Sequence, residues 1–199
     1  MNKKFPLLSK AEQADLSKSI LFFNMQELRR MCEGLQLPSK GKKMALITRI
    51  MTFIETGKIV LEQEIPAISR IKEGQKIPLE SQAKILFGSF KNDAATRAFF
   101  KKLIGEHFHY TAFGVDWISE RWFAGNPPTY KEFAIFWQQE YEARKKTKIP
   151  PKKEWALLNF VAAYLKKFPT AEREEVVTAW KQERAQQVER GMVLLRKIL

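Results

Sequence analysis

The sequence predicts an all-α protein, and three observations lead to this class. Capping patterns, in which Ser, Thr or Asn is followed three residues later by Glu, recur along the chain. The apolar side chains after these caps follow the i, i+3, i+4 spacing of a helix. Glycine and proline separate the helical segments. The 199 residues are 45% hydrophobic and 29% charged, which is typical of folded proteins rather than disordered chains.

Two helices are predicted in the N-terminal part of the chain. Ser9 with Glu12 has the capping-box pattern for the first helix, and Asn24 with Glu27 has it for the second. Gly34 follows the apolar face of the second helix, so we expect it to end that helix in the left-handed conformation.

A third helix is predicted after a tight turn. Ser39 is expected to cap it, its apolar residues follow helical spacing to about residue 55, and Gly57 ends it. Proline and glycine then interrupt residues 59–82, which we interpret as a linker with short extended segments near Ile59 and Ile65.

The remainder is predicted to be helical and rich in aromatic residues. Asp93 and Thr129 are expected to cap two of its helices, an aromatic helical stretch covers residues 108–123, and Thr170 caps the last helix. We predict that the following aromatic side chains form the core: Phe99, Phe100, Phe108, Trp117, Trp122, Phe133, Phe136 and Trp137.

These elements suggest four parts: a helical N-terminal domain at 1–58, a linker at 59–82, an aromatic-rich domain at 83–143, and a basic linker with a helical hairpin at 144–199. The formal charge of +13 is uneven, with +6 over residues 1–60, −1 over 61–142 and +8 over 143–199. Two basic ends around a neutral centre favour a polyanion such as DNA as partner, although solubility alone also explains a basic protein.

The turn before the third helix is the strongest candidate for a DNA-binding site. The first turn of a helix presents free backbone N–H groups and a partial positive charge, where a phosphate can dock. Lysines at that position oppose the helix dipole, so their presence favours an anionic ligand. Arg49 follows Lys42 by seven residues and is expected to share its face. We predict that the following residues contact DNA: Ser39, Lys40, Gly41, Lys42, Lys43 and Arg49, extended by Arg29 and Arg30.

Residues 23–56 resemble the SAP motif, a small helical hairpin of DNA-associated proteins. The resemblance is carried by Leu28, Gly34-Leu35, Pro38-Ser39, Gly41-Lys42-Lys43, Leu46-Ile47 and Arg49-Ile50. It implies binding to double-stranded DNA, often rich in A·T pairs.

Residues 85–137 resemble an uncharacterised bacterial helical domain that often follows a SAP motif, and this second resemblance implies no activity. It is carried by Gly88–Asp93, Thr96–Phe100, Ile104–Tyr110, Trp117, Thr129-Tyr130 and Trp137.

Three further groups of residues invite a functional interpretation. A second candidate phosphate site lies around a helix start and consists of Lys91, Asn92, Thr96 and Arg97, although Asp93 and Thr96 also suit a simple cap. His107 and His109 have no Cys or third His to complete a zinc site, so a packed pair is the favoured interpretation. Cys32 lies on an apolar helix face and is predicted to be a small buried hydrophobe.

The leading hypothesis is a non-enzymatic DNA-binding protein without cofactor. One alternative is an adaptor whose C-terminal helical domain binds a protein partner. Another is a metal-dependent enzyme acting on nucleic acid through Glu106, His107, His109 and Asp116. Charged residues interrupt the apolar segment after the basic N-terminus, and no apolar stretch approaches the roughly 18 residues of a membrane span. We therefore expect a cytoplasmic protein, nucleoid-associated if bacterial, with no membrane partner.

Overall fold

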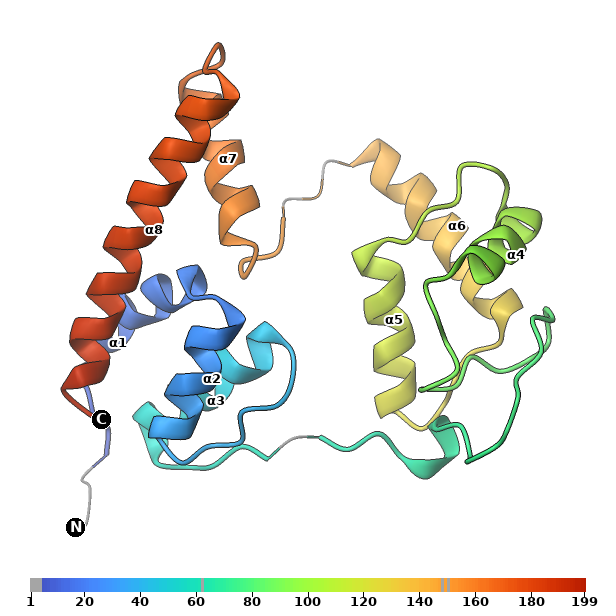
Figure 1. The fold of residues 1–199 in the computed structure, drawn as a ribbon, viewed down its shortest axis with the longest axis horizontal. Helices are drawn as coiled ribbons and strands as arrows, with labels where there is room; N and C mark the ends of the chain where they lie inside the picture. The colour runs from blue at the N-terminus through green and yellow to red at the C-terminus, as the bar shows by residue number, and fades with distance from the viewer. Residues whose placement is uncertain (1–4, 62, 148, 150) are drawn as a thin grey trace. The chain divides into compact units, whose positions relative to one another are not determined.

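The computed structural model describes residues 5–61, 63–147, 149 and 151–199, and over these residues the fold is all-α. It contains eight α-helices and two 3₁₀ helices, about 60% of the chain, and no strand among the described residues. The chain folds into two compact units (Figure 1). Unit 1 combines residues 1–62 with 150–199, and unit 2 spans residues 63–149.

Unit 1 begins with four helical elements: α1 (Lys10–Ser19), η1 (Ile20–Phe22), α2 (Met25–Gly34) and α3 (Lys43–Thr56). The two predicted capping boxes are confirmed. The Ser9 and Glu12 pair starts α1, and the Asn24 backbone N–H donates to the Glu27 carboxylate at 2.6 Å at the start of α2. Gly57 ends α3 with a φ of 72°, also as predicted.

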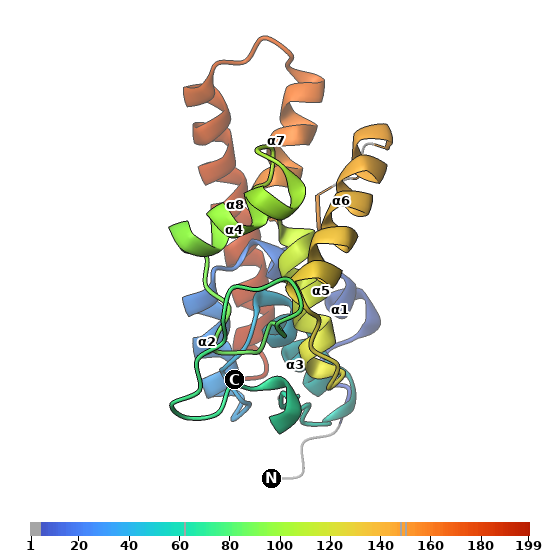
Figure 2. The same ribbon diagram turned by 90° about the vertical axis from the view of Figure 1, so that its right-hand side faces the viewer.

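The C-terminal hairpin belongs to unit 1 and is not a separate part. It consists of α7 (Ala156–Lys167) and α8 (Arg173–Arg196), and α8 packs along α1 and η1 (Figure 1, Figure 2). Close approach is possible because Gly191 of α8 faces the buried ring of Phe23, where a Cβ atom would lie 2.7 Å from the ring. Arg184 adds an ion pair of 2.7 Å to Glu27 of α2. The first helices therefore share one core with the last.

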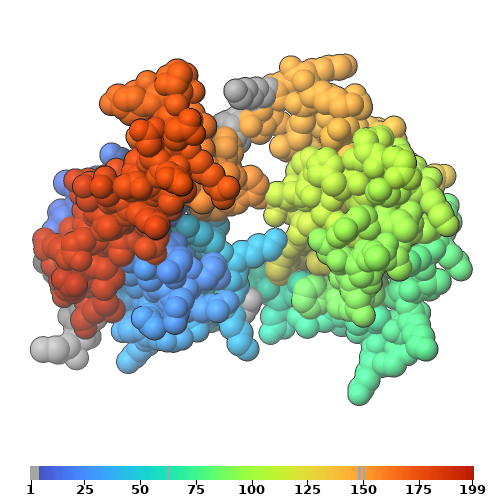
Figure 3. All heavy atoms as spheres, turned by 45° about the horizontal axis from the view of Figure 1, so that its top comes forward, coloured from blue at the N-terminus to red at the C-terminus, as the bar shows by residue number. Residues whose placement is uncertain are grey.

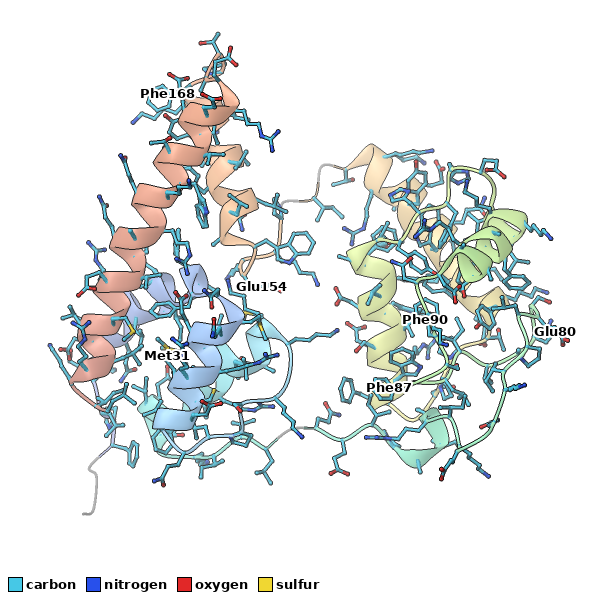
Figure 4. The ribbon with its side chains drawn as sticks, viewed as in Figure 1. Met31, Glu80, Phe87, Phe90, Glu154 and Phe168 are labelled. Atoms are coloured by element: carbon cyan, nitrogen blue, oxygen red, sulfur yellow. The ribbon has the colours of Figure 1, made fainter. Side chains whose placement is uncertain are left out.

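Unit 2 is built from η2 (Ala67–Ser69), α4 (Ala94–Ile104), α5 (Ala112–Phe123) and α6 (Tyr130–Lys146). Phe90, labelled in Figure 4, has four aromatic rings within 6.4 Å, those of Phe100, Tyr110, Trp122 and Phe133. Of the predicted core residues, Phe100, Phe108, Phe133 and Trp137 are buried; Phe99, Trp117 and Trp122 are partly buried against them, and Phe136 stacks on Trp117 at 4.4 Å.

Residues 63–82 are not a free linker, because they belong to unit 2 and are hydrogen-bonded within it. The Ile71 N–H donates to the Phe87 carbonyl at 3.0 Å, and the Phe87 N–H donates to the Ser69 carbonyl at 2.8 Å. The expected extended segments form no strand in the described part of the chain, where the pairing consists of two isolated bridges. Ile59 is 53% exposed, so it lacks the buried face that stabilises a strand.

Three further boundaries differ from the predictions. The aromatic helix α5 begins after Thr111, whose hydroxyl accepts the Gly114 N–H, and not at residue 108. Helix α6 continues through the basic residues to Lys146. This extension is favourable because positively charged side chains near the C-terminal end of a helix interact well with the helix dipole. Helix α8 is capped by Glu172 with Glu175 and not by Thr170.

Candidate nucleic-acid interface

The turn between α2 and α3 is a Schellman motif centred on Gln36. The Leu37 N–H donates to the Cys32 carbonyl at 2.7 Å, and the Gln36 N–H donates to the Glu33 carbonyl at 3.0 Å. Gln36 takes the left-handed conformation with a φ of 58°. The prediction that Gly34 fills this role is wrong, because Gly34 is still helical. A Cβ there would lie 3.0 Å from the Leu199 side chain, so Gly34 permits a close packing contact.

Arg49 is buried beneath the loop that leads into α3. Its side chain is only 3% exposed, and Nη1 donates to the carbonyl oxygens of Pro38, at 3.0 Å, and of Lys40. Nε is buried with no hydrogen-bond partner among the described residues. The prediction that Arg49 shares an exposed face with Lys42 is therefore wrong. Arg49 holds the loop through hydrogen bonds to its backbone carbonyl oxygens. It therefore helps to set the backbone conformation of the exposed residues in that loop.

Helix α3 begins at Lys43, later than predicted. The cap position is Lys42, and Ser39 does not cap the helix, because the extra residues up to Gly41 form a loop held by Arg49. Gly41 has a φ of 119°, a conformation that favours glycine. The first turn of α3 carries neither a side-chain cap nor an acidic residue. Its backbone N–H groups therefore keep the partial positive charge that binds anions.

Lys43 does not belong to the exposed group. Its Nζ donates to the Leu21 carbonyl at 2.5 Å, and its burial lowers the pKa of the ammonium group. This contact ties the start of α3 to η1. The predicted role of Lys43 in DNA contact is therefore replaced by a structural one.

The residues that remain accessible around the loop are Lys40, Gly41 and Lys42, with Ser39 partly exposed. Arg29 and Arg30 are exposed on α2. In the part of the chain that the structure describes, neither arginine makes a hydrogen bond or an ion pair. The candidate interface thus consists of a short basic loop followed by the N-terminal end of α3, which has no side-chain cap.

The second candidate phosphate site is occupied by a carboxylate. Asp93 accepts the Thr96 N–H at 2.8 Å at the start of α4, and this hydrogen bond lowers the pKa of Asp93. Thr96 is buried, and Arg97 donates to the Asn92 side chain at 3.0 Å. Lys91 contributes its carbonyl to the Tyr110 hydroxyl. The four residues lie around one helix start, but the negative charge of Asp93 opposes a phosphate there.

The histidines pack on aromatic rings. The rings of His107 and His109 lie 5.3 Å and 6.0 Å from the ring of Tyr141, and His109 Nδ1 is 3.1 Å from the His107 carbonyl. Glu106 pairs with Lys101 at 2.8 Å. Among the described residues, no three His, Cys, Asp or Glu side chains are grouped closely enough to hold a metal ion.

Cys32 is buried, as predicted, and burial raises the pKa of its thiol. A raised pKa keeps the thiol protonated, so this side chain suits packing and not nucleophilic chemistry.

Comparisons with protein-family models, with curated proteins and with solved structures give no match. No helix in the described ranges has the length and apolar character needed to cross a membrane.

Proposed function

We propose that this protein binds double-stranded DNA through the loop of residues 38–42 and the N-terminal end of α3. The observation that carries the proposal is the uncapped start of α3, which is preceded by two exposed lysines and has no acidic residue in its first turn. Backbone N–H groups, a helix dipole and two neighbouring lysines are then combined within a few residues of the chain, and this combination favours a phosphate. The likeness of residues 23–56 to the SAP motif favours duplex DNA, with A·T-rich sequences as first choice.

The charge distribution supports this assignment. Unit 1 contains 21 Lys and Arg against 12 Asp and Glu, which is +9 of the total +13, and the loop belongs to this unit. A local excess of positive charge attracts a polyanion over distances longer than any single contact. Contacts to phosphates position a protein without reading bases, so we expect affinity to depend more on salt than on sequence.

The proposal is tested by fluorescence anisotropy with a labelled A·T-rich duplex and the full chain. The variant Lys40→Ala with Lys42→Ala removes both exposed ammonium groups and leaves Lys43 and Arg49 in place. Each lost phosphate contact reduces the slope of log affinity against log salt by about 0.9, so we expect the slope to fall by nearly 2. The affinity at low salt is expected to fall by at least tenfold.

The matched control is Lys72→Ala with Lys76→Ala, which removes the same charge from exposed lysines of unit 2. This control is expected to keep most of the affinity and the salt slope. Equal losses in both double variants would reduce the effect to net charge and overturn the proposed site. A G·C-rich duplex and a single strand of equal length test the choice of ligand.

A further inference from the structure

Unit 1 contains a pocket where the start of α7 meets η1 and the start of α3. Its volume is about 430 Å³, within the roughly 300–1,000 Å³ that is typical of small-ligand sites. Figure 1 shows one end of α7 beside the first helices, and the space-filling view shows the C-terminal hairpin (orange to red) packed against them (blue, Figure 3). The pocket is therefore formed by segments that are far apart in the sequence.

Three aromatic side chains from different elements line this pocket. Phe22 of η1 stacks on Trp180 of α8, with the ring centres 5.5 Å apart and the ring planes inclined by 23°. Phe160 of α7 packs on Trp180, also at 5.5 Å, so neighbouring rings hold the Trp180 ring in place. Trp155 at the start of α7 is 37% exposed, which leaves its ring accessible from solvent. Aromatic rings of this kind offer flat faces on which a planar ligand can stack.

Two polar side chains of the pocket are engaged with Glu27. Arg184 binds both carboxylate oxygens of Glu27 at 2.7 Å. The side-chain oxygen of Asn24 accepts the Glu27 N–H at 2.9 Å and so caps α2. The positive charge of Arg184 is thus neutralised within unit 1, and it does not select an anionic ligand.

Lys43 and Glu154 line the same pocket and retain unused hydrogen-bonding capacity. The Lys43 ammonium donates to the Leu21 carbonyl at 2.5 Å, and its other two N–H groups have no partner among the described residues. The Glu154 carboxylate, at the end of α7 nearest the first helices (Figure 4), makes no hydrogen bond or ion pair in the described ranges. Burial lowers the pKa of Lys43, and the charge of Glu154 partly offsets this effect. The pocket thus presents a donor and an acceptor that do not satisfy each other.

We propose that this pocket binds guanine, with the base stacked on the aromatic rings and its Watson–Crick edge directed to Glu154 and Lys43. That edge places two N–H donors, at N1 and N2, beside one acceptor, O6. A carboxylate accepts from both donors through its two oxygens, and an ammonium donates to O6. Adenine, cytosine and thymine each offer a carboxylate only one donor group at this edge, with an acceptor beside it that the carboxylate repels.

An aromatic amino acid also combines a planar group with a donor and an acceptor, but it brings two further charges. Removing those charges from water costs free energy, whereas guanine is neutral. Two sources supply guanine: a free nucleoside or nucleotide, and an unpaired base in DNA. Lys43 directly follows Lys42, so the pocket adjoins the loop of residues 38–42. The inference does not rest on duplex binding, because the stacking and edge contacts use neither Lys40 nor Lys42.

The inference is tested by NMR titration of the full chain, with the indole N–H signals of Trp155 and Trp180 as reporters. The probes are deoxyguanosine, deoxyinosine, deoxyadenosine and deoxycytidine, which carry no phosphate for the loop lysines. We expect deoxyguanosine to shift both signals and to bind at least about fivefold more tightly than deoxyinosine, which lacks the N2 amine, because a bidentate contact discriminates to this extent. Equal affinities for all four probes would overturn guanine recognition, and tighter binding of free tryptophan would overturn the choice of a base.

Glu154→Gln is the decisive variant, because the Glu154 carboxylate supports no contact in the described part of the fold. Glutamine replaces one acceptor oxygen by an N–H₂ donor, a pattern that matches adenine. We expect deoxyguanosine to lose at least about fivefold in affinity while deoxyadenosine gains, a reversal that a purely structural role would not produce. Glu174→Gln, at an exposed position of α8, is the matched control and is expected to bind as the wild type does. An equal loss in this control would overturn the role of Glu154.

Trp155 tests the stacking contact. Trp155→Ala is expected to weaken deoxyguanosine binding by about tenfold, read from the Trp180 signal, and Trp155→Phe is expected to keep most of the affinity. Equal affinities for the alanine and phenylalanine variants would contradict stacking on this ring.

A final comparison distinguishes the two sources of the base. Fluorescence anisotropy compares duplexes that contain one unpaired guanine or one unpaired thymine. Tighter binding of the guanine duplex by the wild type, but not by Glu154→Gln, assigns the pocket to DNA, whereas equal binding assigns it to a free nucleoside or nucleotide. Lys40→Ala with Lys42→Ala is expected to weaken duplex binding and to leave deoxyguanosine affinity unchanged. Failure of the duplex proposal is thus distinguishable from failure of this one.

Discussion

Arg49 holds the carbonyl oxygen of Pro38 at 3.0 Å through Nη1, and so fixes the loop that leads into α3. The same nitrogen donates to the Lys40 carbonyl, and the guanidinium lies under Gly41, within 3.7 Å of the position a Cβ atom would take. The basic residues of the candidate interface are thus displayed by a loop whose shape depends on a buried cation. The exposed lysines of the loop present the positive charge, whereas the buried Arg49 holds the loop in shape.

Replacing Arg49 by Met is therefore expected to weaken both stability and DNA binding. Met keeps much of the apolar stem but removes the donors to two backbone carbonyls, which costs about 1–3 kcal/mol in the free energy of unfolding. Urea denaturation measures this change. The control Arg29→Met alters an exposed arginine and is expected to stay within about 0.5 kcal/mol of the wild type. Unchanged hydrogen exchange in residues 38–42 of Arg49→Met would contradict the supporting role.

Gln36→Gly is expected to stabilise the protein. Gln36 has a φ of 58°, a conformation that costs about 1–2 kcal/mol for residues other than glycine. Glycine removes this cost and loses about 0.5–1 kcal/mol through the greater freedom of its unfolded chain, which leaves a net gain of up to about 1.5 kcal/mol. A shift of the urea midpoint to higher concentration tests this. Gln36→Val is the opposite control, because a β-branched residue tolerates this conformation least, and it is expected to destabilise.

Gly191→Ala is expected to destabilise unit 1. The added Cβ would lie 2.7 Å from Cε2 of Phe23, a fully buried ring that has no space to retreat. Overpacking of this kind costs about 1–3 kcal/mol, more than the roughly 1 kcal/mol that alanine gains in helix propensity. Gly34→Ala is the matched control. Its Cβ would meet only the end of the Leu199 side chain, which is 56% exposed and can move, so no loss is expected. Equal thermal midpoints for both variants would contradict the tight contact.

Local signals predicted the helix starts that depend on neighbouring residues. Ser9, Asn24, Asp93 and Thr129 each bind a backbone N–H three residues ahead, so the sequence alone contains both partners. The attachment of α8 to α2 was not predictable in this way. Arg184 and Glu27 are separated by 157 residues, and no local sequence pattern around either residue predicts that the two form a pair.

The loop of the candidate interface shows where local patterns mislead. Lys43 precedes Leu46, Ile47 and Ile50 by 3, 4 and 7 residues, so it lies on the apolar face of α3, and this spacing could have revealed its burial. For Arg49, the deciding factor is the path of residues 38–41, which no helical periodicity describes. Two of the six cations in the predicted set therefore support the fold, while Lys40, Lys42, Arg29 and Arg30 remain exposed.

The contact between Glu12 and Lys197 predicts a pH dependence of stability. The two side chains lie 2.6 Å apart and join α1 to the C-terminal end of the chain. The hydrogen bond from Lys197, with further hydrogen bonds from Ser9, lowers the pKa of Glu12 from 4.5 to about 2. A carboxylate with a lowered pKa stabilises the fold above its unfolded pKa, and this stabilisation is lost as pH falls from about 4.5 to about 2.

Glu12→Gln removes this titration and is expected to flatten the decline of the thermal midpoint between pH 4.5 and 2 relative to the wild type. Above pH 5 the variant is expected to be less stable than the wild type, because Gln cannot pair with Lys197. The two proteins then converge as the pH approaches 2, where the wild-type carboxyl is itself neutral. Glu55→Gln is the control, because this carboxylate is exposed and makes no ion pair among the described residues. Parallel midpoint curves for Glu12→Gln and the wild type would show that the pair does not link α1 to the C-terminal end in solution.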